Sequence, residues 1–349
     1  MTAKIPQIHI YNKKTANNTG SGNAGKIACI GAFDSEESNP VLFTNVTDAL
    51  GTMGDDSTFD GCACLPYLFM NGADSVLIVN TTTWSGDTPT KTIDTTALTT
   101  ALTKIKGEDW DILFIAAPLT DAFITLIDTY LDATFEMKYP SGYIGALTGV
   151  NDAANIASAG LAGEHVYGLL TQSLTVNDNT LSVLLSSAYY TGLIAGMSVR
   201  NTMTMKTLPN VTGVTPELSF ETGGSGKALL EAGITTIKCA NRNSNRYVVV
   251  NSEQPNGFDL YVNRVRDYVI KALSLHDFLG ERNNELTLSL IKFEVERIKN
   301  ECVDTLDLLK DIEYIVTKKN ATCAEIHISK LLFDGIITEI NVYVTVEVE

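Results

Sequence analysis

The sequence predicts an α/β domain followed by an α+β domain, with a short strand-like arm at each end of the chain. Three observations support this. In residues 25–207, apolar runs with strand character alternate with helical patterns, which is typical of a mostly parallel sheet. In residues 208–338 the order changes to loops, two helices and then strands. Residues 1–24 and 339–349 stand apart from both, and we expect them to form an N-terminal arm with its linker and a C-terminal strand arm.

The predicted strands of the first domain are short apolar runs, as expected of strands that are buried on both faces of a sheet. They begin at Lys26 (KIACIGAF), Ser75 (SVLIVNTT), Trp110 (WDILFIAAP), Ser141 (SGYIGALTG) and His165 (HVYGLLTQ). The predicted helices are TNVTDALGTMG, CLPYLFMNG, TTALTTALTKIKG, AFITLIDTYLDATFEMK, residues 151–160 and residues 182–198. Thr44 or Asn45 can cap the first of them. The alternation of the two patterns predicts an α/β layer.

The second domain is predicted from residue 208 onwards. A loop-rich stretch comes first, and GITTIKCANRNSNRYVVVNS then predicts two short strands. Two helices follow, at residues 260–279 and 285–309. Strands are expected after them, at residues 313–318, 323–330 and 335–349.

The two arms carry regular strand patterns. The last ten residues alternate between aliphatic and polar side chains, and no proline, bulge or basic residue protects the edge of this strand. The aliphatic positions are Ile340, Val342, Val344, Val346 and Val348 in the C-terminal arm, and Ile5, Ile8 and Ile10 in the N-terminal arm. A terminal strand can pair within its own domain, but the small polar residues at 13–25 have linker composition and favour pairing with another copy of the chain by strand addition.

Composition and charge limit the class of protein. Hydrophobic residues make up 44% and charged residues 19% of the 349 residues, which is the balance of a globular chain. The formal net charge of −16 repels phosphate backbones, so we expect no nucleic acid partner. We also expect no direct membrane insertion, because the longest apolar stretch, at 188–199, is too short to span a bilayer and the first residues lack an apolar signal core. The six scattered cysteines predict reduced, mostly buried thiols in a protein that folds in the cytoplasm.

Two short motifs resemble ligand sites without meeting their requirements. GGSGK at 223–227 has Glu221 where a phosphate-binding loop needs its first glycine and Ala228 where it needs a hydroxyl group. A calcium-loop-like start at Asp56 has Tyr67 in the twelfth position, where a bidentate glutamate is required. The four histidines are dispersed, and the C-x-C pair of Cys62 and Cys64 lacks a second pair. We therefore predict no catalytic, cofactor or metal site and no enzymatic activity.

The order of segments resembles the contractile tail sheath family, and the likeness covers nearly the whole chain. TNVTDALGTMG resembles an early helix of that family, LPYLFMNGADSVLIVN its helix, Asn-Gly turn and apolar strand, and WDILFIAAP its strand ending in Ala-Pro. SSAYYTGLIAGMSVRNTMTMKTLPNV and residues 233–303 are similar to its later helix and its C-terminal domain. Two features depart from the family pattern: IKCANRN replaces a W-G-x-R-T strand, and the sequence ends in a plain strand. The short length is similar to that of R-type bacteriocin sheaths such as diffocin and of simple phage sheaths.

The resemblance implies a structural subunit that polymerises into a helical sheath around an inner tube and contracts to drive the tube through a target cell envelope. Its implied partners are further copies of itself, the inner tail tube protein, and baseplate and tail terminator or collar proteins, with no cofactor. Assembly is expected in the cytoplasm of the producing cell, and the product is an extracellular particle, either a phage virion tail or a bacteriocin.

The resemblance also points to a helix of the C-terminal domain as the contact with the inner tube. We assign this contact to the helix at 285–309, with Lys292, Arg297 and Lys299 as its basic residues. The alternative for these three residues is a solvated helix face. Two other functions remain open for the chain: a flavodoxin-like α/β enzyme, and another tail component such as a baseplate or tube protein. Tube proteins are usually shorter and mainly β.

Overall fold

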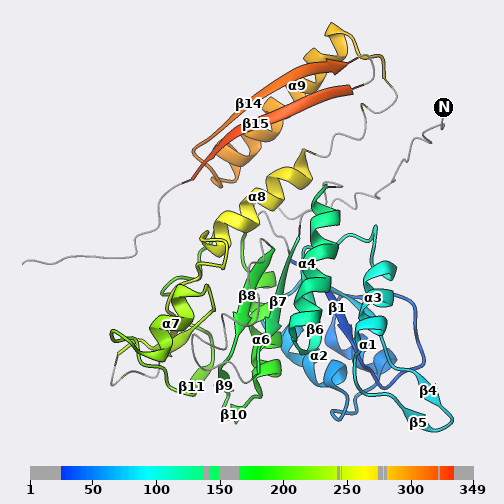
Figure 1. Cartoon of the computed structure of the whole chain (residues 1–349), viewed down its shortest axis with the longest axis vertical. Helices are drawn as coiled ribbons and strands as arrows, with labels where there is room; N and C mark the ends of the chain where they lie inside the picture. Colours follow the sequence, from blue (N-terminus) through cyan, green and yellow to red (C-terminus); the bar gives the residue numbers. More distant parts are fainter. Residues whose placement is uncertain are drawn as a thin grey trace, which may run out of the picture.

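The computed structural model describes residues 25–136, 141–148, 165–241, 244, 246–273, 278, 281–320 and 323–333. Its centre is a six-stranded sheet with the strand order β2-β3-β1-β6-β7-β8 (Figure 1). The strands are β1 (Lys26–Gly31), β2 (Val41–Phe43), β3 (Ser75–Asn80), β6 (Ile112–Pro118), β7 (Gly142–Ala146) and β8 (Val166–Leu170). All neighbours pair in parallel except β2, which runs antiparallel to β3 at one edge. The predicted mostly parallel sheet is confirmed, and β2 is a strand that the sequence did not indicate.

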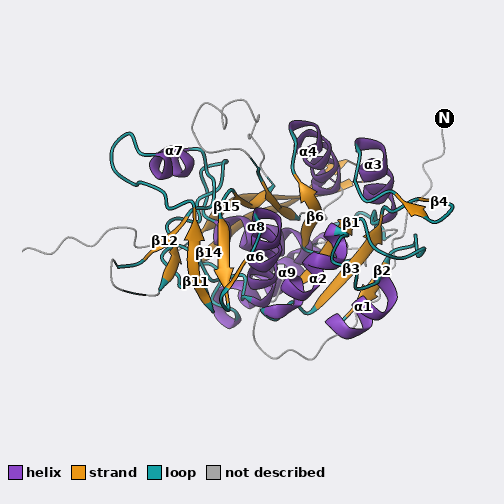
Figure 2. Ribbon diagram, turned by 90° about the horizontal axis from the view of Figure 1, so that it is seen from below, coloured by secondary structure: helices purple, strands orange, loops and turns teal. Residues whose placement is uncertain are grey.

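Helices cover both faces of this sheet, and the alternation of side chains along β1 separates the two layers. Ile27 and Cys29 belong to one hydrophobic cluster, whereas Ala28 and Ile30 belong to the other. The first cluster includes α1 (Val46–Met53), α2 (Asp60–Met70) and α6 (Val183–Gly196); the second includes α3 (Thr95–Lys104) and α4 (Asp121–Glu136). Figure 2 shows α3 and α4 on one side of the sheet and α1 and α2 on the other.

Local sequence signals explain where several of these helices begin. The side chain of Asn45 accepts a hydrogen bond from the backbone N–H of Asp48, so Asn45 rather than Thr44 caps α1. Asp94 and Ser182 cap α3 and α6 in the same way. The predicted helices in these positions are confirmed, whereas the one expected at residues 151–160 lies outside the described residues.

Helix α6 is buried on nearly all sides because it lies between the sheet and α2. Two glycines permit this close approach. A Cβ atom on Gly192 would lie 2.4 Å from the carbonyl oxygen of Leu68, and one on Gly196 would lie 2.1 Å from that of Asn71. The backbones of α2 and α6 therefore pack against each other without intervening side chains at these two positions.

Smaller sheets extend the body beyond β8. One contains β9 (Ser173–Val176), β10 (Asn179–Thr180) and β11 (Val211–Thr215), in the order β10-β9-β11. Another pairs β12 (Ile237–Cys239) with β13 (Tyr247–Val249), as predicted, and a third pairs β4 (Trp84–Ser85) with β5 (Thr88–Pro89). The predicted boundary between the two domains lies between residues 207 and 208, and the pairing of β9 with β11 joins residues on both sides of it. The domain limits themselves stay a prediction.

The C-terminal part has a hydrophobic core of its own. Helix α8 (Leu260–Ala272) leads from the body to α9 (Glu285–Asn300), a π-helical turn η2 (Glu301–Thr305), β14 (Asp311–Asn320) and β15 (Cys323–Leu332). We call residues 285–332 the C-terminal module; it lies at one end of the molecule in Figure 1. Val265 and Val269 of α8 pack with Ile291 and Val295 of α9 and with Val316 of β14. Within the described residues, every helix is too short or too polar to cross a membrane.

Candidate functional site

The hairpin of β14 and β15 is the longest strand pair that the structure describes, with ten residues in each strand. One of its faces carries apolar pairs, Tyr314 opposite Ile328 and Val316 opposite Ile326. The other face is mainly polar and carries the cross-strand ion pairs Lys330–Glu313 (3.5 Å) and Lys319–Glu325 (2.9 Å). The alternation gives the hairpin one face for packing and one for solvent.

Helix α9 covers only part of the apolar face. Val316 of β14 is buried beneath it, whereas Ile326 and Ile328 of β15 remain half-buried. Among the described residues, no further strand pairs with the outer edge of β14 or of β15. Unpaired backbone N–H and C=O groups along such edges are a template for another strand. Both outer edges of the hairpin are thus unpaired within the described part of the chain.

The outward face of α9 is apolar as well. Leu288, Ile291, Val295 and Ile298 face the hairpin and are buried, as one apolar face of a helix normally is. On the opposite side, the side chains of Leu286, Leu290 and Phe293 are 70%, 49% and 71% exposed. Their spacing of four and then three residues places them in one row, which we call the α9 stripe.

The three predicted basic contact residues do not lie on one face of α9. Arg297, four residues after Phe293, is on the same side as the α9 stripe. Lys299 pairs with Asp311 of β14 at 2.6 Å, and the carbonyl oxygen of Lys292 accepts a hydrogen bond from the Tyr314 hydroxyl. Lys292 and Lys299 are thus on the flank of α9 that borders the hairpin.

Two of these basic groups are neutralised within the chain. Arg297 donates hydrogen bonds to Glu294 and Glu301 at distances of 2.6 and 3.1 Å, and these carboxylates raise the pKa of the guanidinium. Lys299 lowers the pKa of Asp311 through their hydrogen bond. The surface of α9 consequently has no strong local excess of positive charge.

Helix α8 joins the module to the body through buried polar groups. The Tyr167 hydroxyl of β8 donates to Asp267 at 2.7 Å, and Lys271 pairs with Asp111 at 2.6 Å. Arg264 is 1% exposed and donates to the carbonyl oxygen of Met197 at the end of α6, and its burial lowers its pKa. These contacts tie α8 to the sheet. In the sequence alone, the same charged residues would equally fit a helix that faces solvent.

The topology also tests the flavodoxin-like alternative. Numbered along the chain, the five parallel strands have the order 2-1-3-4-5, which is the flavodoxin-like order, and ligands of such folds bind beside the carboxyl end of the first strand. Here Phe33, two residues after β1, has no exposed surface, and its backbone N–H donates to Asn80 at 3.0 Å. The backbone N–H of Gly61, in the first turn of α2, donates to the carbonyl oxygen of Ala32. The segment that follows β1 is thus held against β3 and α2 by hydrogen bonds within the chain.

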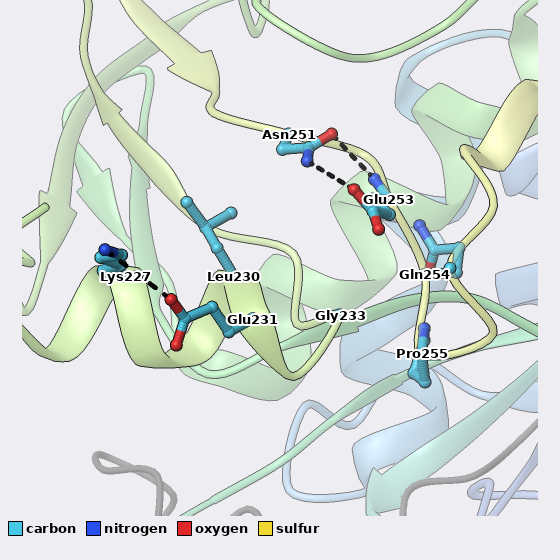
Figure 3. Close-up of a pocket in the computed structure, with 9 residues that line it drawn as sticks. Lys227, Leu230, Glu231, Gly233, Asn251, Glu253, Gln254 and Pro255 are labelled. Carbon is cyan, nitrogen blue, oxygen red and sulfur yellow. Dashed lines mark hydrogen bonds and ion pairs between the residues drawn. The ribbon is translucent and has the colours of Figure 1, made fainter.

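The two ligand-like motifs have structural roles. Asp56 accepts hydrogen bonds from the backbone and side chain of Thr58, which makes a turn just before α2. GGSGK leads into α7 (Ser225–Glu231), which is only seven residues long. A hollow of about 410 Å³ lies between α7 and residues 251–257 (Figure 3). Its charged side chains pair with near neighbours, Lys227 with Glu231 and Glu253 with Asn251.

The other predicted residues are placed as follows. Four of the six cysteines (Cys29, Cys62, Cys64 and Cys302) are buried and all six are free, as expected. Burial raises the pKa of the Cys302 thiol to about 12. No group of three metal-ligating side chains occurs in the described part of the chain. Both arms, including Ile5, Ile8, Ile10, Ile340, Val342, Val344, Val346 and Val348, lie outside the described residues.

Solved structures of contractile sheath proteins have the same fold as this chain. A sheath tail protein from Listeria innocua has 12% identity and a TM-score of 0.64 over 86% of this chain and 88% of its own. One from Desulfitobacterium hafniense has 13% identity and a TM-score of 0.66 over 85% and 90%. A chain in the contracted helical sheath of the anti-feeding prophage has 15% identity and a TM-score of 0.69 over 98% and 99%.

A chain in the baseplate structure of the same anti-feeding prophage also matches, with 14% identity and a TM-score of 0.69 over 99% of this chain and 100% of its own. No protein-family model matches the sequence, and no curated protein matches it. At these identities the likeness establishes the fold. The fold is that of contractile tail sheath proteins, which confirms at this level the resemblance noted in the sequence.

Proposed function

We propose that this chain is the structural subunit of a contractile tail sheath, which polymerises into a helix around an inner tube and contracts to drive that tube through a cell envelope. The observation that carries the proposal is the extent of the match to a chain of the anti-feeding prophage sheath. It covers 98% of this chain and 99% of the other, so it includes the body and the C-terminal module together. The similar chains named above come from sheath tail proteins and from a baseplate structure.

The arms would link neighbouring subunits. The N-terminal arm at residues 5–11 and the C-terminal arm at 339–349 have the alternation of strands, and the edges of β14 and β15 offer backbone groups to receive them. The aliphatic positions of the arms, such as Val342 and Val344, would then continue the apolar face to which Ile326 and Ile328 belong. Main-chain hydrogen bonds of this kind depend little on side-chain detail and survive rigid movement of the two bodies they connect.

Contraction would then be a rearrangement of bodies within a linked lattice. The buried contacts of Arg264, Asp267 and Lys271 fix α8 to the body, so the C-terminal module would move together with the sheet. The linker at residues 13–25 would absorb the change in distance between neighbours. Each exposed ion pair that forms in the contracted state contributes at most about 1 kcal/mol, but the contribution repeats with every subunit.

The remaining partners follow from the same architecture. We assign the inner tube contact to α9, with Lys292, Arg297 and Lys299 as its basic residues, and the ends of the sheath to baseplate and terminator or collar proteins. The subunit would be made in the cytoplasm of the producing cell and act in an extracellular particle, a phage tail or a bacteriocin. No cofactor is required, because the work comes from assembly energy.

Negative-stain microscopy of the purified full chain tests the proposal. We expect hollow rods that assemble without any other component, with masses in the megadalton range by light scattering. A discrete small oligomer that binds nucleotide or flavin would support the flavodoxin-like enzyme instead. An oligomer that forms rings and no rods would support a baseplate component.

A further inference from the structure

The parallel strands of the large sheet all begin at one edge, and the chain enters the body at this edge. β1 starts at Lys26, directly after the linker at residues 13–25. Its parallel neighbour β6 starts directly after Asp111, and Ile112 lies opposite Ile27 in the register of the two strands. Asp111 is therefore placed beside Lys26, where the linker meets the body.

Backbone contacts hold this entry point tightly. The backbone N–H of Asp111 donates to the carbonyl oxygen of Lys26 at 2.9 Å, and Oδ2 of Asp111 accepts from the backbone N–H of Lys26 at 3.2 Å. One residue earlier, the carbonyl oxygen of Gly25 accepts from the backbone N–H of Asp74 at 3.2 Å. A Cβ atom on Gly25 would lie 2.9 Å from the carbonyl oxygen of Ala195. The start of β1 thus has little room to move.

The second carboxylate oxygen of Asp111 holds helix α8. Lys271, in the last turn of α8, donates to Oδ1 of Asp111 at 2.6 Å and to the carbonyl oxygen of Trp110 at 2.7 Å. The side chains of Lys271 and Asp111 are 24% and 15% exposed, so solvent screens this ion pair less than one at the surface. Burial lowers the pKa of Arg264, also in α8, and the negative charge of Asp111 opposes that shift. Asp111 therefore faces two cations of the same helix.

Helix α8 carries the C-terminal module. Val265 and Val269 on one of its faces belong to the core that α9 and the hairpin complete. Figure 1 shows α8 between the large sheet and the module. The position of Lys271 therefore helps to set where the module leaves the body. One carboxylate contacts both this helix and the start of β1.

A fixed geometry between these two points matters most in a regular array. In a helical assembly the same contact repeats from each copy to the next, so a change in its geometry alters the rotation of every following copy. In the proposed sheath, the links to neighbours leave the subunit at the linker before β1 and at the module after α8. Variation in the distance between these two exits would therefore disorder the helix.

We infer that Asp111 is a positioning residue for assembly: it holds the start of β1 and the end of α8 at one carboxylate, and so fixes where the linker and the module leave each subunit. The inference rests on the proposed sheath function, in which both ends of the chain link neighbouring copies. The rotation from one subunit to the next then depends on Asp111 and Lys271, and neither residue needs to contact a neighbour.

The test uses rods formed by the purified full chain. In two variants, Asp111→Asn and Lys271→Met, the joint loses one of its charges and the side chains keep nearly the same size. The matched control is Lys91→Met, which breaks another ion pair of the body, with Asp56 at 3.7 Å. Cryo-electron micrographs of the rods give the spread in rotation between successive subunits, and urea unfolding measures the stability of each chain.

We expect both variants to unfold cooperatively and to form rods in which the spread in rotation is about twofold larger, as when the loss of a supporting contact raises positional freedom from about 0.5 Å to about 1 Å. The double variant should be no more disordered than either single one, because both substitutions break the same contact. Lys271→Arg, which keeps the charge, and Lys91→Met should give rods of normal order. Failure of Lys271→Met to form rods, with cooperative unfolding retained, would be the extreme form of the expected result.

Normal rotational order in the rods of both Asp111→Asn and Lys271→Met would overturn the inference and leave the sheath function intact. An equal loss of order in Lys91→Met would also overturn it, because any lost ion pair would then have the same effect. Absence of rods from the unchanged chain under every condition would overturn the sheath function, and the inference with it.

Discussion

The body and the C-terminal module solve the problem of exposed strands in opposite ways. In the body, the five parallel strands of the large sheet are short and mostly buried on both faces, and β2 at its edge has only three residues. In the module, two strands of ten residues are covered on one face by a single helix, and no described strand closes either edge. Short edge strands limit unwanted pairing, whereas long open ones invite it.

The difference separates stability from assembly. The body buries apolar residues on both sides of its sheet, in two large clusters. The module has a smaller core that depends on α8 and Val199 of the body, and it leaves its hairpin edges and the α9 stripe available. In the proposed sheath, the body would act as a rigid unit and the module would supply surfaces that connect neighbouring copies.

The largest expected effect comes from removing what the module is proposed to receive. Deletion of residues 1–11, or of residues 342–349, should abolish rod formation because the hairpin edges lose the strands that complete them. The shortened chains should stay folded, since neither segment belongs to a described core. Light scattering and negative-stain images measure the first effect, and circular dichroism measures the second. Rods of normal length from both shortened chains would contradict the proposal that the two arms complete the hairpin edges.

The next largest effect concerns the interior of the body. Gly192→Val should lower the free energy of unfolding by about 3 kcal/mol, because its side chain would meet the backbone of α2 at Leu68. Gly51→Ala in α1 is the control: nothing lies within 4 Å of the added Cβ, and alanine favours a helix by about 0.5–1 kcal/mol. Urea unfolding measures both. Equal effects of the two substitutions would show that α2 and α6 are not in close contact.

A smaller effect is that the stabilities of the two regions depend on pH in opposite directions. Burial raises the pKa of Asp128 in α4 from 3.8 to about 6, with Tyr143, Asp132 and His165 nearby, and His165 is 2.9 Å from Asp132. The ionised form is disfavoured in the folded state. Ionisation of Asp128 therefore lowers the free energy of unfolding. This loss is absent below the ordinary pKa of the carboxyl group and fully present once the pH exceeds about 6.

Asp128→Asn should accordingly raise the free energy of unfolding by about 1 kcal/mol at neutral pH, less than the full shift would give because the carboxylate is partly exposed. Near pH 4 the two chains should be equally stable. In the module the sign is reversed, because Lys299 lowers the pKa of Asp311 and that stabilisation is lost as the pH falls. Urea unfolding across this pH range checks the difference, and a gain that is constant with pH would contradict it.

The smallest expected effect is charge reversal on α9. Replacing Lys292, Arg297 and Lys299 together with glutamate should weaken loading onto the inner tube by about threefold, because three exposed ion pairs at about 0.2 kcal/mol each contribute only about 0.6 kcal/mol. Coverage of tubes in negative-stain images measures it. A loss of more than about tenfold would show that the basic residues dominate the contact, and no loss would show that they take no part in it.

The sequence by itself determined the order and type of most elements in the body. Runs such as SVLIVN and ILFIAAP are strands because their apolar side chains must be buried on both faces, and this requirement is visible in a few consecutive residues. The capping side chains of Asn45 and Asp94 likewise act over three residues. Such signals depend mainly on residues that are close together in the chain.

Only the tertiary structure decided the rest, because it depends on residues that are far apart in the chain. β2 is a strand through its pairing with β3, and β9 pairs with β11 more than thirty residues later. Arg264 has the composition of a surface residue but is buried against the end of α6. Lys292, Arg297 and Lys299 formed one basic group in the sequence, and the packing of α9 on the hairpin divided them between two faces, because the direction of a helix face is set by what the helix packs against.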